Sequence, residues 1–269
     1  MQFVRSQDLK PGMRLAKPIY NKMGVLLYER NTKLTLQSIN SIDNFGLIGI
    51  FILEPAEPVP PLSKEDLEFE QFQTIYMFKL KDCMDKLLAQ KNIPAITELV
   101  QNIYTHYGAL DHKLNFTQNL RSSADFVYKH SISVAILSAM IANEMHIEPE
   151  GSQSLIAASL LYDFGYLSVP KSILDKNEDL SASDRDLIQL KSEHGYEIIR
   201  PHFAELGLND TSLEIIQNII FEDHATISPR LPKPPVQLLI DILKAADKFD
   251  RLTAMNINHA PMSDRKSVV

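Results

Sequence analysis

The stretch that decides the fold, residues 157–174, reads AASLLYDFGYLSVPKSIL. It lies in a part of the chain, from about Gln118 onward, where one helical pattern follows another and no convincing strand pattern occurs. Helix starts are indicated at Ser181, which Asp184 follows three residues later, and around Asp210. The sequence therefore predicts that this C-terminal part is all-α.

The first 55 residues predict a small β-rich module. Short apolar or β-branched runs at 13–19, 25–28 and 47–53 have the composition of strands and are separated by turn residues. Between the second and third runs, residues 35–45 carry apolar side chains at helical spacing. We therefore expect a compact β-β-α-β unit.

A proline-rich segment separates this module from the helices. Residues 54–61 hold four prolines in eight positions, which stiffen the backbone and forbid a helix. We therefore predict four parts of an α+β protein that is mainly all-α: a β-rich domain (1–55), a linker (56–62), a helical connector (63–117) and an all-α domain (118–269). Ser63 and Asp66 resemble a capping box that opens the connector's first helix.

Composition excludes several functional classes. A formal charge of −7, from 34 acidic and 27 basic residues, argues against a broad electrostatic surface for DNA or anionic lipid. The single cysteine, Cys83, excludes an intramolecular disulfide and a CxxC motif. The chain has only nine glycines and no glycine-rich phosphate loop, so it carries neither a dinucleotide-binding fingerprint nor a P-loop. With no long apolar run and no secretory layout at the N-terminus, we expect a cytoplasmic protein without membrane insertion.

Four ordered blocks of the C-terminal part resemble HD-GYP domains, the helical domains of cyclic-di-GMP phosphodiesterases. Residues 157–174 are similar, nearly position for position, to the family motif A-A-L-L-H-D-I-G-K-I-x-I-P-x-x-I-L. The other three blocks are the segment that begins with Lys129-His130-Ser131, residues 180–199, and residues 242–250. The last of these resembles the family motif I-L-x-V-A-D-x-F-D. The N-terminal module resembles the small β domain often found ahead of HD-GYP domains. The chain stops where family members usually continue with a further helix, so we expect a trimmed or naturally short C-terminus.

The resemblance implies candidate metal ligands. Metal-assisted phosphodiester hydrolysis uses two cations about 3.5–4 Å apart, which several imidazoles and a bridging carboxylate must hold. The matching positions here are His130, Asp163 and Asp247, with His224 in a segment shorter than that of the family. From the residues alone, a histidine on an apolar stripe is more often a packed core residue, and Asp247 could equally be a salt-bridging carboxylate.

The family pattern is also broken at several positions. Tyr162 replaces the histidine of the HD pair, Lys191 stands at a second histidine, and Tyr166 replaces a lysine. His194 lies three residues after Lys191 and is either a substitute ligand or a surface or packing histidine. The G-Y-P loop is missing from the sequence, and the two phenol rings suggest a filled pocket. We therefore expect no cofactor, or at most one divalent ion of iron, manganese or zinc.

Three functional hypotheses follow. The leading one is a catalytically degenerate HD-GYP-like pseudoenzyme that acts in bacterial signalling through a protein partner or as a homodimer. The helix predicted over residues 64–91 suits dimerisation, although it would pack equally well on its own domain. The second is an active phosphohydrolase with a rewired site of His130, Asp163 and Asp247. The third is a protein that binds cyclic-di-GMP without cleaving it. The cations that would contact its phosphates are Lys191, Arg200 and Arg230.

Overall fold

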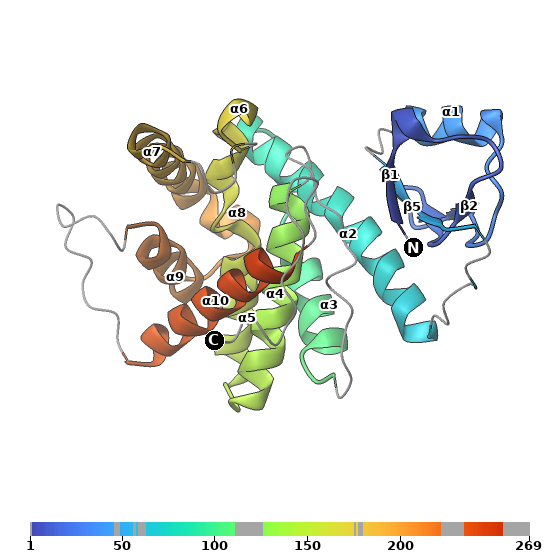
Figure 1. The fold of residues 1–269 in the computed structure, drawn as a ribbon. Coiled ribbons are helices and arrows are strands. Elements are labelled where there is room, and N and C mark those ends of the chain that lie inside the picture. The colour runs from blue at the N-terminus through green and yellow to red at the C-terminus, as the bar shows by residue number, and fades with distance from the viewer. Residues whose placement is uncertain are drawn as a thin grey trace. The chain divides into compact units, whose positions relative to one another are not determined.

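The computed structural model describes residues 2–45, 49–55, 58, 63–110, 126–174, 176, 180–221 and 234–254. Contacts divide the chain into two compact units, Met1–Phe78 and Lys79–Val269. The N-terminal unit is β-rich and the C-terminal unit is built from helices, as Figure 1 shows. These elements confirm the predicted fold class, an α+β protein that is mainly helical. The division into four parts remains a prediction.

The N-terminal unit contains two small antiparallel sheets. In the first, β5 lies between β1 and β2; in the second, β3 pairs with β4. Helix α1 begins after Thr35, whose side chain forms a capping box with Ser38. The bounds are β1 (Gln2–Arg5), η1 (Ser6–Asp8), β2 (Arg14–Leu15), β3 (Ile19–Tyr20), β4 (Leu26–Tyr28), α1 (Leu36–Asn44) and β5 (Gly49–Leu53).

The β-β-α-β prediction for this unit was incomplete. The run 13–19 was predicted as one strand, but its ends belong to β2 and β3, which pair in different sheets. Pro18 lies between them, and proline has no N–H to offer to a ladder. Strand β1 was missed because its four residues include no alternation long enough to predict a strand.

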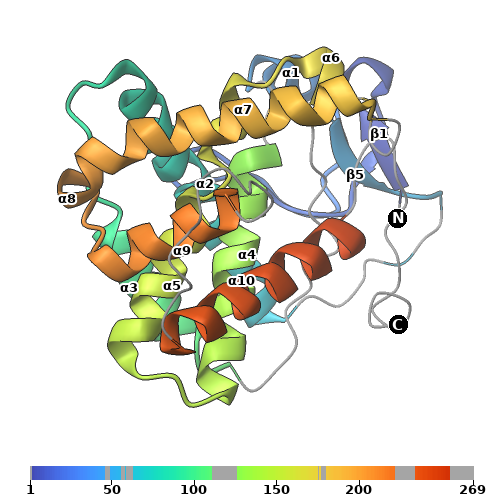
Figure 2. The same ribbon diagram turned by 90° about the vertical axis from the view of Figure 1, so that its left-hand side faces the viewer.

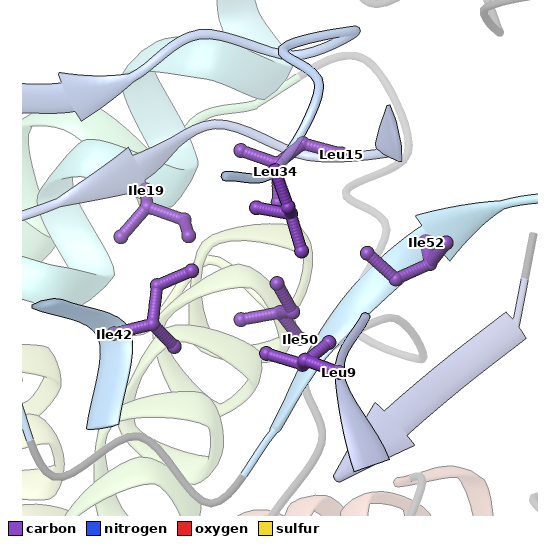
Figure 3. Close-up of a cluster of buried hydrophobic side chains, with 7 residues drawn as sticks. All are labelled: Leu9, Leu15, Ile19, Leu34, Ile42, Ile50 and Ile52. Carbon is purple, nitrogen blue, oxygen red and sulfur yellow. The ribbon is translucent and has the colours of Figure 1, made fainter. Parts of the chain in front are cut away.

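The core of the N-terminal unit is aliphatic. Its side chains come from strands, from α1 and from the segments between them, and they converge in Figure 3. Each is at most 8% exposed. The members are Leu9, Leu15, Ile19, Leu34, Ile42, Ile50 and Ile52. Burial of this apolar surface is the main term that stabilises such a small module.

Helix α2 (Lys64–Ala89) begins in the N-terminal unit and ends in the C-terminal one. The predicted capping box is confirmed, because Asp66 N–H donates to Ser63 Oγ and Ser63 N–H donates to Asp66. In the C-terminal unit, α2 contributes Leu80, Met84 and Leu87, which are 0% exposed. These apolar side chains are therefore buried within the chain itself.

In the C-terminal unit, α4 and α5 pack against each other, and α3, α9 and α10 pack around them (Figures 1 and 2). The short helix η3 packs on α7. The remaining bounds are α3 (Thr97–Tyr107), α4 (Phe126–Glu144), α5 (Pro149–Leu161), η3 (Phe164–Ser168), α6 (Lys171–Leu174), α7 (Ala182–Ile199), η4 (Arg200–His202), α8 (Phe203–Leu206), α9 (Asp210–Phe221) and α10 (Pro234–Thr253). Within the described ranges, none of these helices combines the length and apolarity that a bilayer span requires.

Two predicted helix starts are present in this unit. Ser181 and Asp184 form a reciprocal capping box at the start of α7. At α9 the capping side chain is Asn209, whose Oδ1 accepts from the N–H of Ser212. Both caps satisfy backbone donors that a helix start otherwise leaves unpaired.

Candidate functional site

Three segments that are far apart in the sequence meet at the centre of the C-terminal unit. Helix α4 supplies His130, and the junction between α5 and η3 supplies Tyr162 and Asp163. Helix α10 supplies Asp247 and Asp250, which lie three residues apart and therefore on one helix face. We refer to these five residues together with Arg251 as the central cluster.

His130 is fully buried and has a carboxylate on each side of its ring. Its Nδ1 lies 2.6 Å from Asp250 Oδ2, and its Nε2 lies 2.9 Å from Asp247 Oδ1. The same Nε2 is 3.4 Å from Asp163 Oδ2. The ring also stacks on Phe126, with 5.0 Å between centroids and 13° between planes. These contacts fix the imidazole in one orientation.

Tyr162 closes the cluster next to His130. Its hydroxyl donates to Asp247 Oδ1 at 2.5 Å and lies 2.7 Å from His130 Nε2. The side chain is buried, and burial, followed by the charges of Asp163 and Asp247, raises the pKa of Tyr162 well above its usual value. The phenol therefore stays protonated and acts as a hydrogen-bond donor.

Arg251 places a guanidinium between two carboxylates. Its Nε donates to both oxygens of Asp247, at 2.9 and 3.1 Å, and a terminal nitrogen donates to Asp163 Oδ2 at 2.7 Å. The guanidinium carbon lies 5.6 Å from the ring centroids of both Phe126 and Tyr166. Charge-assisted hydrogen bonds and aromatic contacts of this kind suit the planar arginine head group.

The two carboxylates that share Arg251 titrate differently. Burial raises the pKa of Asp163, and Arg251 and His130 only partly oppose that shift. Burial also acts on Asp247, but Arg251 and the hydrogen bond to His130 outweigh it and hold its pKa well below the usual range. Of the two carboxylates, Asp247 is therefore the one that keeps its charge to the lower pH.

Two glycines bring η3 close enough to position Asp163 and Tyr166. A Cβ atom added at Gly165 would lie 2.4 Å from the backbone oxygen of Lys191 on α7. One added at Gly195 would lie 2.7 Å from the backbone of Gly165. Because backbone meets backbone here, neither position has room for a side chain.

The cluster includes a group that satisfies the distance criterion for a metal site. One ligand atom from each of His130, Asp163 and Asp247 lies within 4.8 Å of the others. Whether a divalent ion fits this group depends on what else contacts these atoms. The Asp163 and Asp247 oxygens accept hydrogen bonds from Arg251, and the guanidinium would repel a second cation. With Arg251 in this position, the donor set does not fit a divalent ion.

The structure thus brings together three of the four predicted metal ligands. His130, Asp163 and Asp247 lie in one cluster, whereas His224 is outside the described residues. Their role as ligands remains a prediction.

Of the predicted phosphate-binding cations, Arg230 also lies outside the described residues. Lys191 is half-buried on α7, and Arg200 is exposed and pairs with Glu197 at 2.8 Å. His194, the candidate substitute ligand, is exposed. A role for these cations in phosphate binding remains a prediction.

Sequence reasoning missed the roles of Asp250, Arg251 and Phe126. A signal for the first two was available, because Asp250 and Arg251 follow Asp247 by three and four residues and share its helix face. No comparable signal marked Phe126, whose contacts with His130 and Arg251 depend on how α4 and α10 pack.

Comparison with known proteins shows what the C-terminal unit is similar to. The HD domain family model matches residues 127–252, a range that contains the whole central cluster, so this part of the chain is similar to HD domains. A cyclic di-GMP phosphodiesterase, PdeB of Borreliella burgdorferi, is 31% identical over 67 residues. The matched segment is 25% of this chain and only 18% of that relative. No solved structure gave a significant match.

Proposed function

We propose that this protein is a catalytically degenerate, HD-GYP-like module that serves bacterial cyclic-di-GMP signalling without hydrolysing a phosphodiester. The observation that carries this proposal is that the predicted ligand atoms form hydrogen bonds with one another and with Arg251. Asp247 accepts from Tyr162 and from Arg251, and Asp163 accepts from Arg251. These groups stabilise the fold as a closed network, whereas a catalytic metal site must keep a position open for water or substrate.

Several features support the degenerate assignment beyond the network itself. A phenol with a raised pKa stands where the HD histidine would offer a neutral nitrogen ligand. Tyr166, at the position of the family lysine, packs its ring against Arg251. The segment that carries these substitutions is nevertheless similar to HD domains over residues 127–252. A retained fold with a closed centre is what we expect of a protein selected for binding a partner.

An active HD-type phosphohydrolase is the second candidate. It is favoured by the approach of His130, Asp163 and Asp247 to within 4.8 Å and by the partial similarity to a cyclic di-GMP phosphodiesterase. In that case Arg251 would have to leave the carboxylates when a metal ion enters. The two candidates differ in the metal content of the folded wild-type protein, which decides between them.

The test combines elemental analysis with a hydrolysis assay. The full chain, purified without chelators from medium supplemented with iron, manganese and zinc, should contain far less than one metal ion per chain and should not cleave cyclic-di-GMP. Two metal equivalents together with turnover would overturn the proposal. An activity that requires metal and is abolished by Asp163→Ala, with the fold intact by circular dichroism, would establish the second candidate instead.

The remaining outcomes concern the partner. In this proposal the module acts through a protein partner or a second copy of the chain, and light scattering on the purified protein measures the latter. Calorimetric titration with cyclic-di-GMP separates nucleotide binding from pure protein interaction. Heat without hydrolysis, lost in Lys191→Ala or Arg230→Ala, would establish a nucleotide-binding module.

A further inference from the structure

Arg251 is held more tightly than a surface arginine. It lies near the end of α10, one turn after Asp247, and its side chain is 34% exposed. Three charge-assisted hydrogen bonds and two aromatic rings fix its head group, whereas exposed arginines usually sample several rotamers. The side chain reaches back over its own helix to join Asp247 to Asp163, which α10 does not carry.

The charges around Arg251 explain why a cation is needed at this point. Asp163 and Asp247 approach each other at the centre of the unit, and their side chains are only 6% and 24% exposed. Two carboxylates this close repel each other unless a positive group lies between them. His130 Nε2 lies near both carboxylates as well, but the guanidinium of Arg251 carries a permanent positive charge and donates hydrogen bonds to both of them.

We propose that Arg251 is the resident cation of the central cluster, and that its guanidinium closes a latent metal site formed by His130, Asp163 and Asp247. This inference rests on the proposed function, because it explains how an HD scaffold keeps its carboxylates without a metal ion. The guanidinium neutralises the same two carboxylates that a divalent ion would neutralise. It also donates hydrogen bonds to the carboxylate oxygens that such an ion would bind. One side chain thus both stabilises the centre and excludes metal from it.

The proposal predicts that loss of the guanidinium opens the site to metal. Arg251→Met keeps an aliphatic side chain between Phe126 and Tyr166 but removes the charge and the hydrogen bonds. Removing a positive charge a few ångströms from an incoming cation should raise the affinity for Mn²⁺ at least about tenfold over wild type. Electron paramagnetic resonance, which distinguishes free from bound Mn²⁺, measures this affinity without any assay of activity.

Matched variants separate the effect of this position from a general loss of positive charge. Arg251→Lys keeps the charge and should bind Mn²⁺ as poorly as wild type. Arg185→Met makes the same substitution at an exposed arginine of α7 and should also leave Mn²⁺ binding unchanged. The double variant Arg251→Met with Asp163→Asn should lose the gained affinity, because one of the three ligand groups is then neutral.

The results that would overturn the inference are distinct from failure of the proposed function. Folded Arg251→Met that binds Mn²⁺ no better than wild type contradicts the inference, even when wild type is free of metal and inactive. If Arg251→Met is unfolded in the absence of metal, the inference requires that Mn²⁺ restore the folded state, and continued unfolding in Mn²⁺ contradicts it. Metal bound by wild type with turnover would instead refute the proposed function.

Discussion

Two buried clusters, one in each unit, are stabilised in opposite ways. In the N-terminal unit, aliphatic side chains such as Ile42 and Leu15 pack without a polar atom among them. In the central cluster of the C-terminal unit, His130 and Asp250 are just as deeply buried, at 0% and 1% exposure, but they are ionisable and hydrogen-bonded to each other. Stabilisation by apolar burial grows with the area buried and does not depend on the orientation of the groups. A buried ionic network, in contrast, requires every hydrogen-bonding partner to be in place.

This difference determines what a substitution should do. In the aliphatic core the cost follows the volume removed and should be independent of pH. In the central cluster the cost follows the hydrogen-bonding partner that is lost and the charge that is left behind. Four substitutions, taken in order of decreasing expected effect, test whether the cost of a substitution differs between the two clusters as stated.

Ile42→Ala tests the aliphatic core and should have the largest effect. Ile42 is 0% exposed, so its truncation leaves a cavity and should cost about 2–5 kcal/mol of unfolding free energy. Urea denaturation followed at pH 6 and pH 8 should give the same loss at both values. Ile42→Val, the matched smaller deletion, should cost about 0.5–1.5 kcal/mol. A loss that varies with pH would show that this core is not purely apolar in its energetics.

Gly165→Ala tests how the backbone of η3 positions the central cluster. The added Cβ would lie 2.4 Å from the Lys191 carbonyl oxygen, so η3 must move away from α7 at a cost of about 3 kcal/mol. Gly151→Ala on α5 is the matched control. Its Cβ would lie 3.1 Å from Ile147 Cγ2, a side-chain atom that can shift, so its melting temperature should change little. Equal melting temperatures for the two variants would contradict the close approach of η3 to α7.

Tyr162→Phe tests one hydrogen-bonding partner within the cluster. It removes the hydroxyl that donates to Asp247 and contacts His130, and it should cost about 1–2 kcal/mol. Tyr166→Phe retains the ring that packs on Arg251 and should cost less. Chemical denaturation of both variants measures the difference. If the two substitutions were equally mild, the Tyr162 hydroxyl would not be part of the network.

Asp184→Asn gives the smallest expected effect, at the first turn of α7. Hydrogen bonds from Lys176, then from Ser181, lower the pKa of Asp184 from 3.8 to about 2. A lowered carboxyl pKa stabilises the folded state above about pH 4 and loses that contribution as the pH falls towards 2. The melting temperature of wild type should therefore exceed that of the variant at pH 6, and the gap should shrink between pH 4 and pH 2. A gap that is constant with pH would contradict this assignment.

The sequence was sufficient for the features that depend on local pattern. Helical spacing and capping residues predicted α1, α2 and α7 close to their observed starts. The inward direction of His130 followed from the apolar stripe on α4, and the residue is fully buried. The convergence of His130, Asp163 and Asp247 was predicted from the resemblance to a family, not from spacing, because these residues lie on three separate segments.

The features that sequence reasoning missed depend on tertiary packing. Tyr162 and Tyr166 were expected to fill the pocket, but the cation that they accompany was not foreseen. Arg251 becomes part of the site only because α10 packs on α4 and close to η3, which brings the guanidinium against Asp163, 88 residues away in sequence. Short strands such as β1 and β2 were equally hard to predict, because pairing with β5 rather than a local pattern defines them.

The central claim is that an arginine, not a metal ion, holds the carboxylates of the central cluster together. Anomalous diffraction from crystals grown with Mn²⁺ tests it most directly, because the signal places manganese among His130, Asp163 and Asp247 or excludes it. We expect density for the Arg251 guanidinium between the two carboxylates and no anomalous peak. A peak about 2.0–2.2 Å from these side chains, with Arg251 displaced, would contradict the claim.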